Sequence, residues 1–167
     1  MQPAQMRTSS AAQLEAPRVE NSRALLVAGL RGQFTNEPWN GTPELWRRFA
    51  SDLGKIPGQV GRTAYGLCFL LSNGVEYFAG VEVSGVSGLP GDFATVSIPA
   101  QKYLVFPHGG HVSKLHLTCE MISEWLPTSG YEAAKSPGAP DFFERYAEDF
   151  DPRTGMGGVE VWVPIKA

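Results

Sequence analysis

The sequence predicts an α+β fold in which a β-α-β-β unit occurs twice, with antiparallel sheets and the helices on one face. The first observation behind this prediction is the tetrapeptide Gly-Val-Glu-Val, which begins at Gly80 and again at Gly158, an offset of 78 residues in a chain of 167. The second is that the same order of strand-like and helix-like patterns occurs in each half. An offset close to half the chain is the spacing expected of equivalent strands in two repeats.

The first unit begins with residues 23–34, whose aliphatic and β-branched side chains predict a strand. Thr42 and Pro43 supply an N-cap and a first-turn proline, which predicts a helix over 43–54. Two more strands are predicted at 63–73 and 75–84, joined across the hairpin sequence Asn73-Gly74. The apolar stripe of the predicted helix consists of Leu45, Phe49 and Leu53.

The second unit repeats this order. Residues 91–109 predict strand structure interrupted by a proline turn, and residues 111–130 predict a helix. The last two strands are predicted within 143–150 and 157–166, where β-branched and aromatic residues are again frequent.

A chain of this length is expected to bury its core in one domain, at residues 23–167, with repeat halves of about 23–88 and 89–167. The polar residues 1–22 predict a flexible lead-in. No apolar run in the sequence is long enough to cross a bilayer, and no segment has the pattern of a targeting signal.

Charge and cysteine usage narrow the function classes. The net charge is −3, and Arg47-Arg48 is the densest basic point, so the chain lacks the basic patch that direct nucleic-acid binding requires. Cys68 and Cys119 lie in apolar runs, as buried thiols do, although a disulfide between them stays open. A reducing cytoplasm is the expected location.

The two glutamates of the repeated tetrapeptide are the first candidate ligand-binding residues. Because side chains alternate along a strand, Glu82 and Glu160 point away from the valines beside them. Trp162 shares the face of Glu160, and an indole beside a carboxylate on an otherwise exposed face is typical of a concave binding wall. Such a wall suits a flat, lipophilic cation. The alternative for both glutamates is a solvated sheet face.

Further aromatic residues are expected near the opening of this site. Each is alternatively a core side chain, but as a set they indicate an aromatic cage. They are Trp39, Tyr65, Phe78, Tyr103, Phe106 and Tyr146.

No cofactor and no metal site are predicted. His108, His111 and His116 form an H-x2-H-x4-H pattern, but no cysteine or suitably spaced carboxylate completes a familiar ligand set. Gly109-Gly110 lacks the fuller spacing of a phosphate loop, and the sequence holds no G-x-S-x-G elbow.

The run from Tyr77 to Glu132, the strand FERYAEDF and the ending VEVWVPIK resemble the GyrI-like small-molecule-binding domains, also called effector-binding domains of AraC-type and MerR-type regulators. This resemblance implies duplicated SHS2-type units with a ligand groove between the halves. It also implies that Glu160 anchors a lipophilic, often cationic ligand, and that Tyr146 lies in the pocket. Only about 22 residues precede the first predicted strand, so the chain resembles the stand-alone members of the family.

Three functions follow as hypotheses. The favoured one is a binding protein that senses or sequesters a hydrophobic, cationic small molecule, as part of transcription regulation or of multidrug resistance. The second is a hydrolase of strained electrophiles such as cyclopropane-bearing natural products, with Glu160 as general base and Tyr146 or Tyr65 as its partner. The third is a protein partner that inhibits DNA gyrase.

Overall fold

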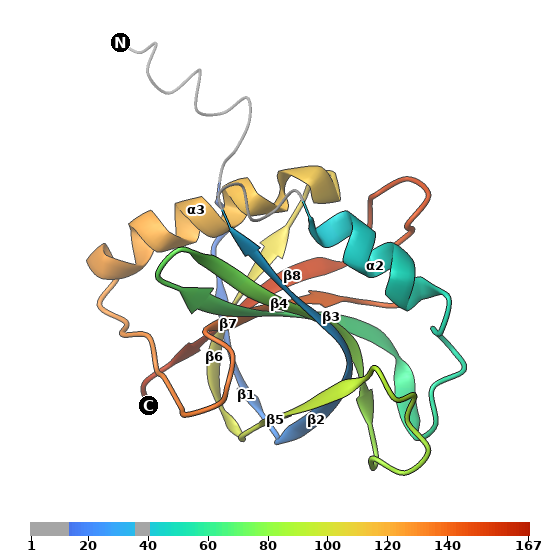
Figure 1. The fold of residues 1–167 in the computed structure, drawn as a ribbon. Coiled ribbons are helices and arrows are strands. Elements are labelled where there is room, and N and C mark those ends of the chain that lie inside the picture. Colours follow the sequence, from blue (N-terminus) through green and yellow to red (C-terminus); the bar gives the residue numbers. More distant parts are fainter. Residues whose placement is uncertain (1–13, 36–40) are drawn as a thin grey trace.

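The computed structural model describes residues 14–35 and 41–167, and their strands form an eight-stranded antiparallel sheet with two helices on one face (Figure 1). The strands of the first half are β1 (Arg18–Ser22), β2 (Leu25–Thr35), β3 (Gln59–Leu71) and β4 (Gly74–Val83). Those of the second half are β5 (Ala94–Ile98), β6 (Gln101–His108), β7 (Phe142–Tyr146) and β8 (Val159–Ile165). The helices are α2 (Thr42–Ala50) and α3 (Leu115–Trp125).

The elements occur in the order β2-α2-β3-β4 and then β6-α3-β7-β8. The strand order across the sheet is β1-β6-β8-β7-β3-β4-β2-β5, so each unit contributes three adjacent strands with β4 or β8 in the middle. The two units meet where β7 pairs with β3. The α+β class, the antiparallel pairing and the helices on one face are therefore confirmed.

The short connections require the sheet to curl. β5 and β6 lie six positions apart in the sheet, yet only Pro99 and Ala100 join them. Six strand spacings would be about 29 Å in a flat sheet. Three Cα steps reach no more than about 11 Å. The link between β1 and β2 imposes the same requirement, so the sheet folds round until its edges approach each other, as Figure 1 shows.

Both helices are shorter than predicted. The first begins after Gly41, which occupies the N-cap position expected for Thr42, and it ends at Ala50 instead of residue 54. Leu53 consequently lies in the turns beyond the helix and is 44% exposed, whereas Leu45 and Phe49 are buried as expected. The predicted helix over 111–130 consists of α3 flanked by two single 3₁₀ turns.

The predicted lead-in of residues 1–22 contains a strand at its end. β1 pairs with β6 over five residues, from Arg18 opposite Val105 to Ser22 opposite Gln101. Polar side chains such as Glu20 and Asn21 hid this strand from the sequence pattern, because β1 is an edge strand that is largely exposed.

The sheet separates two apolar regions. On the helix face, one cluster packs under α2 around Phe49 and Tyr77, and a second packs under α3 around Phe106 and Val161. On the opposite face, inside the curl, a third cluster is built around Phe143 and its neighbours. None of the described helices is both long and apolar enough to cross a membrane.

Candidate functional site

The structure divides the predicted site residues between the two faces of the sheet. Inside the curl lie Glu82, Glu160, Trp162, Tyr65 and Phe78, together with Tyr103. Tyr146 and Phe106 belong instead to the cluster under α3 on the helix face. The predicted cage therefore does not come together as one site, because strand alternation sends its members to opposite sides. Trp39 lies outside the described residues.

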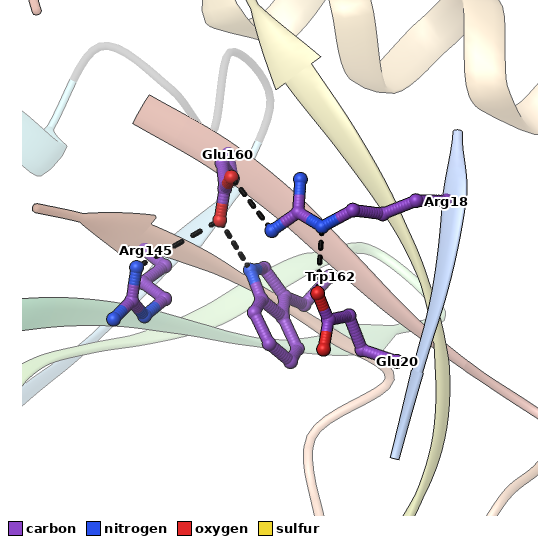
Figure 2. Close-up of polar contacts among 5 residues, drawn as sticks. All are labelled: Arg18, Glu20, Arg145, Glu160 and Trp162. Carbon is purple, nitrogen blue, oxygen red and sulfur yellow. Dashed lines mark hydrogen bonds and ion pairs between the residues drawn. The ribbon is translucent and has the colours of Figure 1, made fainter. Parts of the chain in front are cut away.

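Inside the curl, Glu160 and Trp162 are in contact as expected. The indole N–H of Trp162 donates a hydrogen bond of 3.0 Å to Oε1 of Glu160 (Figure 2). Arg18 donates to Oε2 at 2.9 Å, and Nη1 of Arg145 lies 3.8 Å from Oε1. The carboxylate that was expected to meet a ligand cation is thus already surrounded by two guanidinium groups of the chain.

Glu82 has an equivalent arrangement in the first unit. Arg23 donates two hydrogen bonds to it, of 2.6 Å and 2.9 Å. The Glu82 side chain is 13% exposed, while that of Arg23 is 67% exposed. The repeated glutamates therefore bind arginines from one N-terminal segment, Arg18 for Glu160 and Arg23 for Glu82.

A cavity of about 160 Å³ opens beside these ion pairs. We call it the arginine cavity. Its lining residues are Ser22, Arg23, Leu25, Tyr65, Phe143, Arg145 and Trp162. Burial raises the pKa of the Tyr65 hydroxyl, and the nearby Arg145 guanidinium opposes that rise.

The helix face holds a site residue that the sequence analysis missed. Glu144 on β7 is 4% exposed, and its Oε1 accepts hydrogen bonds of 2.6 Å from both the Tyr77 and Tyr146 hydroxyls. The indole N–H of Trp46 in turn donates to the Tyr77 hydroxyl at 2.9 Å. Strand alternation was the signal that could have found Glu144, because it lies two residues before Tyr146 on the same face.

This cluster, which we call the Glu144 cluster, brings both units together. Tyr77 comes from β4, Tyr146 and Glu144 come from β7, and Trp46 comes from α2. Desolvation raises the pKa of Glu144, and the two tyrosine hydrogen bonds oppose the rise. In the described residues, no Lys, Arg or His forms an ion pair with Glu144.

Gly66 makes room for the cluster. It lies opposite Glu144 in the pairing of β3 with β7. A Cβ atom at this position would lie 2.0 Å from the Tyr77 hydroxyl oxygen and 2.8 Å from Oε1 of Glu144. Because Gly66 has no side chain, the Tyr77 hydroxyl and the Glu144 carboxylate can pack directly against the backbone of β3.

Two of the three histidines, His108 and His111, form local hydrogen bonds. The ring of His108 contacts the Thr118 hydroxyl and the carbonyl of His111, each at 2.8 Å. The His111 ring accepts from the backbone N–H of Ser113 and so caps the 3₁₀ turn before α3. Within residues 14–35 and 41–167, no group of three His, Cys, Asp or Glu side chains is placed to hold a metal ion. Cys68 and Cys119 are free thiols.

The arginine cavity, with aromatic walls and a few polar groups, has the kind of lining that small-molecule sites have. Residues 15–166 match the family model described as the GyrI-like small molecule binding domain, so the chain belongs to this family.

Known relatives agree with this assignment. The transcriptional regulator BrlR of Pseudomonas aeruginosa is 28% identical over 151 residues, which cover 89% of this chain and 54% of BrlR. The chain thus spans about half the length of that regulator.

Two solved structures share the fold. The structure of SAV2435 bound to tetraphenylphosphonium has a TM-score of 0.72 at 21% identity and covers 92% of this chain and 95% of its own. The C-terminal domain of EcmrR has a TM-score of 0.69 at 14% identity, and the match covers 92% of this chain and 98% of that domain.

Proposed function

We propose that this protein is a receptor that senses or sequesters lipophilic cations, and that the ligand binds at the Glu144 cluster between the two units. The observation that carries the proposal is the buried carboxylate of Glu144, which has no ion-pair partner in the described part of the chain. A buried carboxylate is costly unless a positive charge is close to it. A ligand cation supplies that charge, so binding relieves a cost that the free protein bears.

The surroundings of Glu144 favour a lipophilic cation over a small hydrated ion. The Trp46 ring lies edge-on to Tyr146 at 5.2 Å between centroids and to Tyr77 at 6.3 Å. Aromatic faces attract cations and provide apolar contact area. A small inorganic ion would lose its hydration shell there without enough oxygen ligands to replace it.

Trp46 is the side chain through which such a ligand reaches Glu144. It is only partly buried and packs against both clusters of the helix face. Its helix α2 is nine residues long and has two buried residues, Leu45 and Phe49. A displacement of α2 or of the Trp46 side chain breaks the hydrogen bond from Trp46 to Tyr77 and exposes the tyrosines and the carboxylate, but it does not require the hydrogen bonds from the tyrosines to Glu144 to break.

Glu160, the anchor expected from the sequence, is the weaker candidate. A cation that binds to Glu160 must displace Arg18 from a hydrogen bond of 2.9 Å. Glu144 requires no such exchange. The likeness of the fold to SAV2435, whose structure is bound to tetraphenylphosphonium, supports a cationic ligand for this chain as well.

The test is a titration with tetraphenylphosphonium and with the neutral triphenylphosphine oxide, followed by calorimetry. We expect wild-type protein to prefer the cation, and Glu144→Gln to weaken cation binding at least about tenfold, which corresponds to about 1.4 kcal/mol. Glu160→Gln is the matched control, an acid-to-amide change on the other face of the sheet, and should bind as wild type does.

Mass spectrometry of the ligand after incubation tests for turnover. We expect the cation to be recovered unchanged. Equal affinity for the cation and the neutral compound, or loss of binding in Glu160→Gln with none in Glu144→Gln, would overturn the proposal. If incubation with a cyclopropane-bearing compound yielded a hydrated product, the protein would be a hydrolase and not a receptor.

A further inference from the structure

The arginine cavity lies on the opposite side of the sheet from the Glu144 cluster. Phe143 and Arg145 line it, and they flank Glu144 along β7, so their side chains point away from that of Glu144. A ligand in this cavity therefore occupies a different place from the cation proposed above.

The size of the cavity limits the ligand to one ring. Its volume is about 160 Å³. An apolar cavity of about 150 Å³ is known to bind benzene, whereas pockets for drug-sized molecules range from about 300 to 1,000 Å³. A molecule with four rings such as tetraphenylphosphonium does not fit, but a single six-membered ring does.

The walls of the cavity favour a planar ring. Phe143 and Trp162 are stacked, with centroids 5.6 Å apart and ring planes 15° from parallel. Tyr65 lies edge-on to Phe143, with centroids 5.6 Å apart. Stacked and edge-on contacts are the arrangements that aromatic rings prefer.

The charged residues that line the cavity are both arginines, and they differ in how firmly they are held. Arg23 is bound to Glu82 by two hydrogen bonds. Arg145 is 3.8 Å from Glu160, beyond hydrogen-bond distance, and its Cζ lies 5.9 Å from the centroid of the Trp162 ring (Figure 2). The guanidinium of Arg145 also has a hydrogen bond with the neutral Tyr65 hydroxyl, but no carboxylate accepts a hydrogen bond from it in the described residues, so a carboxylate ligand is the stronger acceptor.

Because Arg145 is held less firmly than Arg23, the cavity favours an anionic ligand over a cationic one. An anion binds Arg145 without breaking a hydrogen-bonded ion pair, and a planar carboxylate matches the fork of guanidinium donors. A cation in the same place would first have to displace Arg23 from Glu82 or Arg18 from Glu160. Tyr65 supplies a further donor, since burial raises its pKa and keeps the hydroxyl protonated at neutral pH.

We propose that the arginine cavity is a second ligand site, which takes small planar aromatic carboxylates with the carboxylate on Arg145 and the ring against Phe143 and Trp162. The ligand class is opposite in charge to the one proposed for the Glu144 cluster. The two sites are therefore independent in location and in chemistry.

The test follows the indole N–H signals of the four tryptophans by NMR during a titration with benzoate. Trp162→Phe is used only to assign the signal of Trp162. We expect a saturable shift of that signal with benzoate, and at least about tenfold weaker binding of benzamide and of benzylammonium.

Variants identify the residue responsible. Arg145→Gln should weaken benzoate binding at least about tenfold, and Arg145→Lys should restore part of the loss because charge returns without the planar fork. Arg31→Gln is the matched control, because Arg31 also has a carboxylate partner, Glu76 at 3.3 Å, and lies 6.0 Å from a ring, Phe78, but does not line the cavity.

Glu144→Gln separates this proposal from the previous one and should leave benzoate binding unchanged. The proposal is wrong if millimolar benzoate gives no saturable shift at Trp162, if benzamide or benzylammonium binds as well as benzoate, or if Arg145→Gln and Arg31→Gln behave alike.

Discussion

Replacing Gly66 by alanine tests the packing of the Glu144 cluster. The new Cβ would lie 2.0 Å from the Tyr77 hydroxyl oxygen and 2.7 Å from the ring carbon that carries it. Tyr77 is 1% exposed, and its hydroxyl is held by hydrogen bonds with Trp46 and Glu144. Its 2.6 Å hydrogen bond to Glu144 must therefore lengthen or break.

The loss in free energy of unfolding expected for Gly66→Ala has two contributions. Forcing an extra methyl group into a packed core costs about 1 to 3 kcal/mol. Losing a hydrogen bond to a charged group costs about 1.5 to 3 kcal/mol. We expect Gly66→Ala to lower the free energy of unfolding by about 2.5 to 6 kcal/mol. This is a large part of the about 5 to 15 kcal/mol typical of a domain.

Urea unfolding followed by tryptophan fluorescence measures this loss. Gly91→Ala is the control, because no atom lies within 4 Å of its added Cβ and its backbone is not left-handed. It should be neutral or gain up to about 1 kcal/mol. In the Gly66→Ala background, Tyr77→Phe should recover part of the lost stability, since the nearest clashing atom is removed while the ring carbon at 2.7 Å remains. A loss below about 1 kcal/mol for Gly66→Ala would refute the tight contact between strand and cluster.

Three further predictions follow from charge and burial. Affinity for tetraphenylphosphonium should rise with pH while Glu144 is protonated, by up to about tenfold per pH unit, because the cation must displace the proton. Above the raised pKa of Glu144 the affinity should become constant. An affinity of wild type that does not change with pH would contradict this. Burial raises the pKa of the thiols of Cys68 and Cys119, so at pH 8 the native protein should react with a disulfide reagent at least about 100-fold more slowly than the unfolded chain. Arg18→Gln should cost less than about 1 kcal/mol in urea unfolding, because its pair with Glu160 is partly exposed, and a loss above about 2 kcal/mol would show that the pair is more than a surface contact.

Local periodicity predicted most of the fold correctly. The strands around both Gly-Val-Glu-Val segments and the proline turn between β5 and β6 are present in the structure. The hairpin between β3 and β4 is present too, but it turns at Ser72-Asn73, one residue before the predicted Asn73-Gly74. The errors lie where local preference is weak. The sequence pattern does not predict β1, because this exposed edge strand carries polar side chains. The predicted first helix is longer than α2, because the sequence has no strong helix-end signal before Gly54.

The candidate site was harder to predict. Alternation along one strand correctly placed Glu160 and Trp162 on the same face. It does not say which face of one strand adjoins which face of another, so Tyr146 and Phe106 were grouped with residues that lie across the sheet from them. Alternation puts Glu144 on the same face as Tyr146, but it does not say whether that face is buried, so the sequence analysis did not select Glu144.

The sequence by itself determined the succession of strands and helices and the pointing of each side chain relative to its neighbours, because these depend on contacts within a few residues. Only the tertiary structure decided which charges meet. Arg18 and Arg23 reach Glu160 and Glu82 over 142 and 59 residues of chain. Glu144 lies between two tyrosines because β7 pairs with β3 beside β4 and because α2 packs Trp46 over the same face of the sheet. The electrostatics of a site depend on distance in space, and that is set by packing the whole chain.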